Sequence, residues 1–137
     1  MLTAFCGDDS FDYDEGYRGL GQFWCTVQAS DDGDRGGEHD GGTEPEAATP
    51  YATPVIYNAT YVGNGEGRAL TFRDNAGGEY HNSIFTNWAK GIDIENLNAD
   101  QDSFKQFQDG NLALAGNVFW AINAGDTASE LFTLSCE

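Results

Sequence analysis

A six-residue pattern occurs three times in the chain, at residues 56–61, 80–85 and 114–119. Each copy begins with an apolar or aromatic residue, has a small or amide residue at its centre, and ends with a β-branched residue followed by an aromatic one. The copies are 24 and then 34 residues apart, and a period of about 20 to 50 residues is typical of solenoids and propellers. Stacked coils allow an amide at one turn position to hydrogen-bond with the amides above and below it. We therefore expect Asn58 and Asn82 at equivalent turn positions of adjacent coils.

A second series, of alternating apolar triplets, also indicates strands. The triplets lie at residues 70–72, 92–94 and 112–114, offset by 22 and then 20 residues. Alternation with period two is typical of a half-buried strand. Together the two series predict an all-β solenoid. The alternative is a β-sandwich, in which strands recur about every 8–12 residues and some spacings coincide by chance.

The length of 137 residues predicts one solenoid domain over residues 1–137. Its 18 glycines favour short strands joined by turns over a helical bundle. Residues 30–50 are acidic, rich in glycine and almost free of apolar groups, so we expect a long loop there. Residues 96–110 are interpreted as an insertion, with a short helix whose Phe104 and Phe107 face inward.

The net charge of −17 comes from 23 acidic and only 6 basic residues. It argues against nucleic acid as a partner, because phosphate contacts need lysine and arginine. No apolar run is long enough to cross a bilayer, so we expect no membrane insertion. The N-terminal residues lack the basic region and apolar stretch of a signal peptide. A cationic ligand, a divalent metal or simply salty surroundings are compatible with this charge.

Three cysteines, Cys6, Cys25 and Cys136, allow at most one internal disulfide. Cys6 and Cys25 are 19 residues apart, which is close to one coil, so they can stack in adjacent coils. Whether they form a disulfide or remain reduced thiols inside strands is left open by the sequence.

Two acidic runs are candidate calcium sites. Calcium takes six to eight oxygen ligands, and closely spaced carboxylates supply them. The candidate ligands are Asp8, Asp9, Asp12, Asp14, Asp32 and Asp34. The second run is not an EF-hand, because Thr43 stands where the bidentate glutamate of that loop belongs. The alternative for both runs is a solvated acidic edge.

The triplet Glu38, His39 and Asp40 is the best candidate for catalysis, because histidine titrates near neutral pH. Adjacent residues of an extended segment point in opposite directions, so convergence of the three is not assured. Arg68 and Arg73 can supply a basic partner. A catalytic site would require these residues to converge with the acidic residues 8–15 in one cleft.

Several stretches resemble a family of large secreted bacterial proteins. These stretches are residues 7–14, 21–24, 33–42, 54–61 and 69–78. The family consists of uncharacterised right-handed parallel β-helix proteins, often lipoprotein-like or cargo of type IX secretion. The resemblance covers most of residues 5–120 and implies a right-handed parallel β-helix, of which this chain is a middle-to-C-terminal fragment. It also implies an extracellular or cell-surface location, and it assigns no catalytic residue.

Three functions are compatible with these observations. The first is a non-catalytic module for adhesion or for binding a polysaccharide or cell-surface glycan, since aromatic rings can stack on sugars. The second is part of a carbohydrate-active enzyme, similar to a polysaccharide lyase or glycoside hydrolase. The third is a purely structural segment. Open solenoid ends also predict self-association, because they leave strand edges unpaired.

Overall fold

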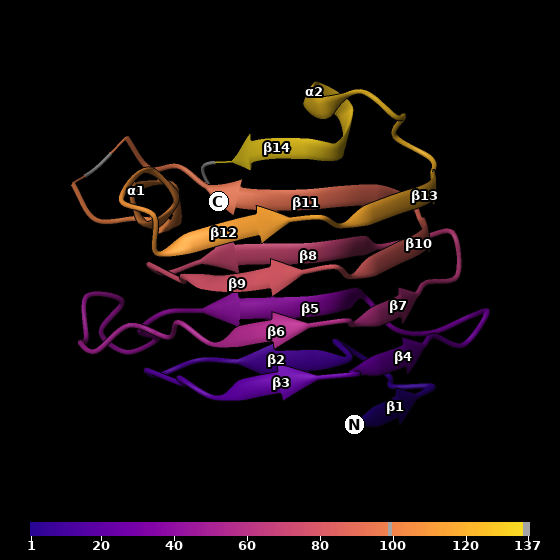
Figure 1. Ribbon diagram of the computed structural model, residues 1–137, viewed down its shortest axis with the longest axis horizontal. Coiled ribbons are helices and arrows are strands. Elements are labelled where there is room, and N and C mark those ends of the chain that lie inside the picture. The colour runs from indigo at the N-terminus through magenta and orange to yellow at the C-terminus, as the bar shows by residue number, and fades with distance from the viewer. Residues whose placement is uncertain (99, 136–137) are drawn as a thin grey trace.

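The computed structural model describes residues 1–98 and 100–135. In these residues fourteen strands form three sheets, which the chain visits in turn, and every strand pair is parallel (Figure 1). Sheet A contains β1 (Leu2–Ala4), β4 (Cys25–Val27), β7 (Thr60–Val62), β10 (Ile84–Trp88) and β13 (Val118–Ile122). Sheet B contains β2 (Phe11–Tyr13), β5 (Arg35–Asp40), β8 (Arg68–Arg73), β11 (Lys90–Glu95) and β14 (Phe132–Ser135). Sheet C contains β3 (Leu20–Gln22), β6 (Val55–Tyr57), β9 (Gly78–His81) and β12 (Leu112–Ala115).

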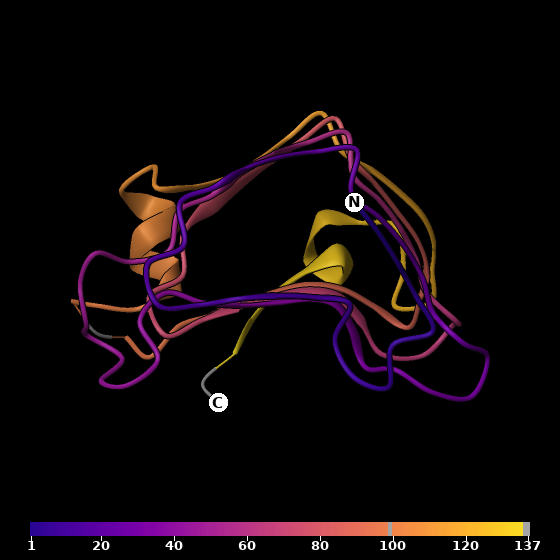
Figure 2. The same ribbon diagram turned by 90° about the horizontal axis from the view of Figure 1, so that it is seen from below.

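The chain is therefore a parallel β-helix, as the repeats predict, and not a β-sandwich. With the N-terminus below, the nearer strands run from left to right and the farther strands run back as the chain rises (Figure 1). This direction of winding is right-handed. Seen along the axis, the three sheets enclose one interior, and the helix α2 (Ala128–Leu131) lies across its C-terminal opening (Figure 2).

The register confirms the six-residue repeat without gaps. Ile56 pairs with Tyr80, which pairs with Leu114, and Thr60, Ile84 and Val118 are aligned in the same way. The second interval is longer because the segment with α1 (Ser103–Gln108) is inserted between β11 and β12. The predicted insertion at residues 96–110 is thus confirmed. The expectation that Phe107 of this insertion faces inward is wrong, because its side chain is 46% exposed. Phe104 does pack against the core, as expected.

Rows of large side chains fill the interior. Tyr61, Phe85 and Phe119 form one row across sheet A, with ring centroids 5.5 and 5.3 Å apart. Full burial of such a side chain is worth about 1.5–3 kcal/mol. Across sheet B, Leu70 pairs with Ile92, which confirms two of the predicted triplets.

The third triplet was assigned wrongly. Residues 112–114 belong to β12 in sheet C, and β14 is the strand that aligns with residues 92–94, through Phe132 and Leu134. The interval between β11 and β14 includes a whole traverse of sheets C and A together with two helices. Phe23, at the turn between β3 and β4, has a φ of 57° and is 66% exposed.

The predicted loop at residues 30–50 is wrong in its middle part, because β5 is a central strand of sheet B. Its inward positions are Gly36, Gly37 and His39, so no apolar alternation marks the strand. A Cβ on Gly36 would lie 2.6 Å from the Ala69 carbonyl oxygen and 3.0 Å from the rings of Trp88 and Tyr61. Glycine is required there because those rings occupy the interior. Residues 41–54 after the strand do form a loop.

Two other predictions concern the cysteines and the membrane. Cys6 and Cys25 are free thiols, so the disulfide alternative does not hold for this pair. Cys136 lies outside the described residues. Within the described ranges, no helix is long and apolar enough to cross a membrane.

Candidate functional site: the outer face of sheet B

Polar side chains cover the outer face of sheet B in rows that run across its strands. Because side chains alternate along a strand, the residues between the inward apolar positions all point outward. The middle row consists of Asp12, Glu38, Thr71, Asp93 and Thr133. Beside it Asp40 pairs with Arg73 and Glu95 with Ser135, and on the other side lie Arg35, Arg68 and Lys90. Loops at both ends of these strands extend beyond the face and border it (Figure 2).

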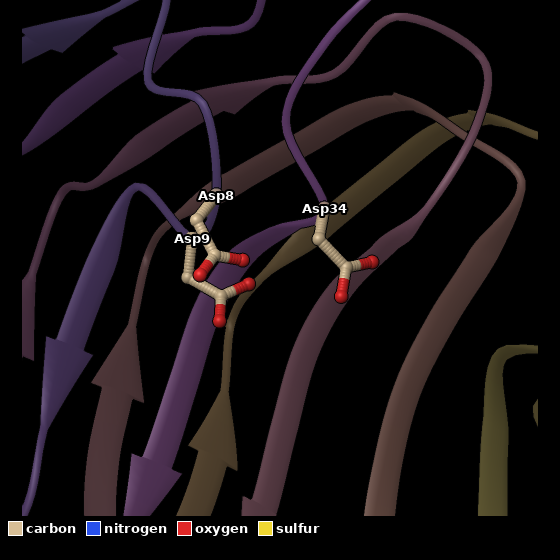
Figure 3. A group of neighbouring side chains, drawn as sticks. All are labelled: Asp8, Asp9 and Asp34. Carbon is tan, nitrogen blue, oxygen red and sulfur yellow. The ribbon is translucent and has the colours of Figure 1, made fainter.

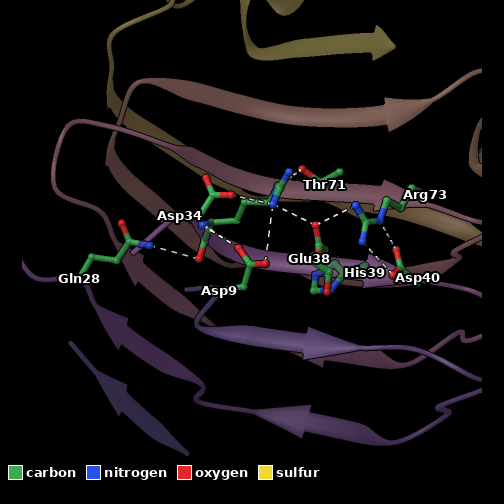
Figure 4. Close-up of polar contacts among 9 residues, drawn as sticks. Asp9, Gln28, Asp34, Glu38, His39, Asp40, Thr71 and Arg73 are labelled. Carbon is green, nitrogen blue, oxygen red and sulfur yellow. Dashed lines mark hydrogen bonds and ion pairs between the residues drawn. The ribbon is translucent and has the colours of Figure 1, made fainter. Parts of the chain in front are cut away.

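Two arginines hold Glu38 in the middle of the face (Figure 4). The Glu38 carboxylate lies 2.9 Å from the guanidinium of Arg35 and 3.1 Å from that of Arg73. Arg73 also donates from Nε to Asp40 Oδ1 at 2.7 Å, and Arg35 donates from Nε to the Thr71 hydroxyl at 3.0 Å. Such charge-assisted contacts fix the side chains in one arrangement.

A second polar group surrounds Asp93 on the neighbouring strands. Its Oδ1 lies 3.3 Å from Arg68, and the hydroxyls of Thr133 and Ser135 donate to its two oxygens. Asp93 is only 3% exposed, so this carboxylate is solvated by the protein instead of water. The face therefore carries two preformed clusters of donors and acceptors.

Glu95 is the carboxyl group of this face that titrates nearest to neutral pH. The pKa of Glu95 is raised to about 7, mainly by burial and also by the nearby carboxylates of Asp74, Glu46 and Asp102, although a hydrogen bond from the Asp74 backbone amide opposes the rise. Burial also raises the pKa of Glu38 despite its two arginine partners, and the pKa of Asp12 is raised by burial and by Asp40 and Asp14.

The three residues of the catalytic triplet do not converge. Glu38 and Asp40 point outward, whereas His39 is completely buried in the interior and stacks on Tyr13 with ring centroids 3.8 Å apart. Its Nδ1 lies 2.6 Å from the Glu38 carbonyl, so Nδ1 carries the proton and Nε2 accepts from the Tyr80 hydroxyl at 2.8 Å. Burial lowers the pKa of His39 to about 3. His39 is thus a neutral core residue with no path to a ligand on the outer face.

The acidic runs come together only in part. Carboxylate oxygens of Asp8, Asp9 and Asp34 lie within 4.8 Å of one another at one end of the strands (Figure 3). Asp12 instead lies on the open face, and Asp14 and Asp32 are exposed outside this group. The three clustered carboxylates can hold a hard cation. Arg35 already faces them, donating from its backbone amide to Asp9 and lying 2.8 Å from Asp34. Burial raises the pKa of Asp9 to about 6.

The comparisons with known proteins identify the family. The model of a family described as the pectate-lyase like beta helix domain matches residues 1–133. The chain belongs to this family. Searches of curated proteins and of solved structures gave no significant match. As a pectate-lyase-like β-helix domain, the chain is part of a carbohydrate-related family. The polar face of sheet B, as one continuous surface, was not predicted from the sequence.

Several residues of that face carried a signal in the sequence. Thr71 lies between Leu70 and Phe72, and Asp93 between Ile92 and Ile94, so alternation already placed both outward. Their alignment into one row of the pectate-lyase-like domain depends on the strand register. Thr133 lies in the same way between Phe132 and Leu134, whereas Arg35 lies in a segment without apolar alternation.

Proposed function

We propose that this domain binds a polysaccharide chain on the outer face of sheet B. The observation that supports it most strongly is the position of the basic residues. Of 6 lysines and arginines in an otherwise acidic chain, four, namely Arg35, Arg68, Arg73 and Lys90, lie on this one face. A surface selected only for acidic solubility would not gather its few cations in one place.

The chemistry of the face suits sugar hydroxyls, each of which donates one hydrogen bond and accepts others. Carboxylates such as Asp12 and Glu38 accept, the arginines donate, and Thr71 and Thr133 can do both. The side chains are already held by their mutual contacts, so little conformational entropy is lost on binding. Location outside the cell or on its surface remains an expectation that goes with this proposal.

Hydrolysis of the bound glycan is the second candidate function, and the pKa of Glu95 favours it. A glycoside hydrolase pairs a protonated carboxylic acid with an ionised carboxylate. Glu95, with its pKa of about 7, fits the acid, and Asp93, two residues earlier on β11 and 3.3 Å from Arg68, is the candidate for the second carboxyl group. A lyase mechanism has less support, because the hydrogen bond to Asp40 raises the pKa of Arg73 and makes it a poorer base.

The test is affinity electrophoresis through gels containing neutral or acidic polysaccharides, with release of reducing ends and of unsaturated products measured in parallel. We expect retardation by at least one polysaccharide. Asp12→Asn and Thr133→Val should weaken it, because both side chains are exposed on the face; circular dichroism checks that Thr133→Val, which removes a hydrogen bond to Asp93, is folded. Asp126→Asn, an equal loss of charge at an exposed position before α2, should leave it unchanged.

Three outcomes decide between the candidates. Retardation that all three variants share equally would contradict a site on sheet B. Reducing ends that appear with the wild-type chain and disappear in Glu95→Gln, with retardation preserved, would establish hydrolysis. No retardation in any polysaccharide would leave only the structural role.

A further inference from the structure

A concavity of about 300 Å³ lies at the corner between sheets B and C, where α1 is inserted. It lies away from the outer face of sheet B. Each of the four complete coils contributes to its wall, with Arg18 before β3, Tyr51 before β6, Glu79 in β9 and Asn111 before β12. Gln106 of α1 closes one side. The concavity is therefore formed jointly by the corner of the coils and by α1.

Arg18 is the first unusual member of this wall. It donates from Nε to the Tyr51 carbonyl oxygen at 3.2 Å, and it forms no ion pair with any described residue. In a chain of net charge −17, an arginine without a carboxylate partner is unexpected. The ends of its guanidinium group are available as donors to a ligand.

Gln106 and Glu79 complete the polar set. Gln106 is only 7% exposed, and its Oε1 accepts from Asn111 Nδ2 at 3.0 Å. Its Nε2 has no partner among the residues the structure describes, so an amide donor is left at the wall of the concavity. Glu79 uses Oε2 to contact His81 Nε2 at 2.6 Å, which leaves Oε1 as an acceptor.

We propose that this concavity binds one neutral sugar ring, either free or as a unit of a glycan. Donors from Arg18 and Gln106 and an acceptor from Glu79 line the same space, and hydroxyls satisfy both kinds of group. Tyr51 lines the same space, and a tyrosine ring is a flat apolar surface on which a sugar can stack. The volume is at the lower limit of ligand sites, about 300–1,000 Å³, which suits a single ring.

The same set disfavours an anionic ligand. Glu79 would lie beside any carboxylate or sulfate bound by Arg18, and the whole chain repels anions. The proposal is independent of the function proposed for sheet B, because none of the residues of this wall belongs to that face.

The test is a titration of ¹⁵N-labelled protein, followed through the side-chain amide signals of Gln106 and Asn111. The probes are the methyl glycosides of glucose, galactose, mannose and xylose, with sodium sulfate and methyl glucuronoside as anionic comparisons. We expect saturable shifts with at least one neutral glycoside. Arg18→Gln and Glu79→Gln should each raise its Kd at least tenfold. Lys105→Gln removes a cation from the same helix outside the wall and should leave the Kd unchanged.

Two results would overturn the proposal. One is the absence of saturable shifts with every neutral glycoside. The other is saturation by sulfate or the glucuronoside alone, which would make Arg18 the centre of an anion site. Circular dichroism of each variant shows whether it is folded, and since Arg18 and Glu79 are both accessible to solvent, folded variants are expected.

Discussion

Asn58 and Asn82 lie one above the other at the turn between sheets C and A. Both residues have left-handed backbone conformations, with φ values of 57° and 51°. The backbone N–H of Asn58 donates to the backbone carbonyl of His81, the residue before Asn82, at 2.9 Å. Gly116 takes this position in the next coil with a φ of 67°. The expected equivalence of the two asparagines is confirmed. The turn uses their tolerance of positive φ, since no hydrogen bond joins the two side-chain amides in the described structure.

Replacing Asn82 tests this interpretation of the turn. Asn82→Val should lower the free energy of unfolding by about 1–3 kcal/mol, because a β-branched residue is strained at positive φ. Asn82→Gly should change it by less than about 1 kcal/mol, since glycine adopts this backbone freely. Urea unfolding measures both. Ala115→Val, at an exposed extended position of β12, is the control and should be nearly neutral. Equal losses in Asn82→Val and Asn82→Gly would show that the side chain matters, not the backbone.

The burial of His39 predicts a dependence of stability on pH. The pKa of His39 is about 3 in the folded chain, whereas the ordinary value of 6.5 applies to the unfolded chain. As pH falls, the unfolded chain therefore binds a proton at this histidine before the folded chain does. The unfolding free energy should therefore decrease as pH falls below about 6.5 toward 3. His39→Phe keeps an aromatic ring in the core and should remove that part of the pH dependence. Chemical unfolding between pH 4 and 8 is the measurement, and an unchanged slope in His39→Phe would contradict the assignment.

Calcium binding by the cluster of Asp8, Asp9 and Asp34 remains a prediction. We expect calcium chloride to raise the melting temperature more than sodium chloride at equal ionic strength, because a ligand that binds only the folded chain stabilises it. Asp8→Asn with Asp34→Asn should abolish the difference. Asp12→Asn with Asp14→Asn removes as much charge outside the cluster and should preserve it. Equal effects of the two salts on the wild-type chain would mean that the carboxylates are only a solvated edge.

Self-association through the N-terminal end is a further prediction. There β1, β2 and β3 have one unpaired edge each, around a cavity of about 640 Å³ lined by Phe11, Tyr13 and Trp24. Unpaired edges with apolar surface favour strand addition. Asp12, Asp14 and Glu15 also line the cavity, so association should increase with salt. Sedimentation should show it, and Ala4→Pro should weaken it, because the Ala4 amide lies on the unpaired edge of β1. A monomer at every salt concentration would argue against it.

The sequence predicts the coils where each position has a constant chemical character. Ile56 and Tyr80 both face inward, and their spacing contains no inserted residues, so one period sufficed to align them. β5 could not be predicted because Gly36, Gly37 and His39 replace the apolar residues that mark a strand. The polar face depends on register across the insertions at residues 41–54 and 96–110, and local periodicity carries no information about such alignment.

Sheet B also sets a length scale for whatever lies on it. Strands of a sheet are about 4.8 Å apart, so its five strands span only about 19 Å along the axis. A regular polymer laid along that axis meets chemically related side chains at each step only if its own repeat is close to this spacing. A polymer with another repeat loses register within a few units. For the glycan proposed above, these five strands therefore set the length that they can contact and favour a repeat close to the strand spacing.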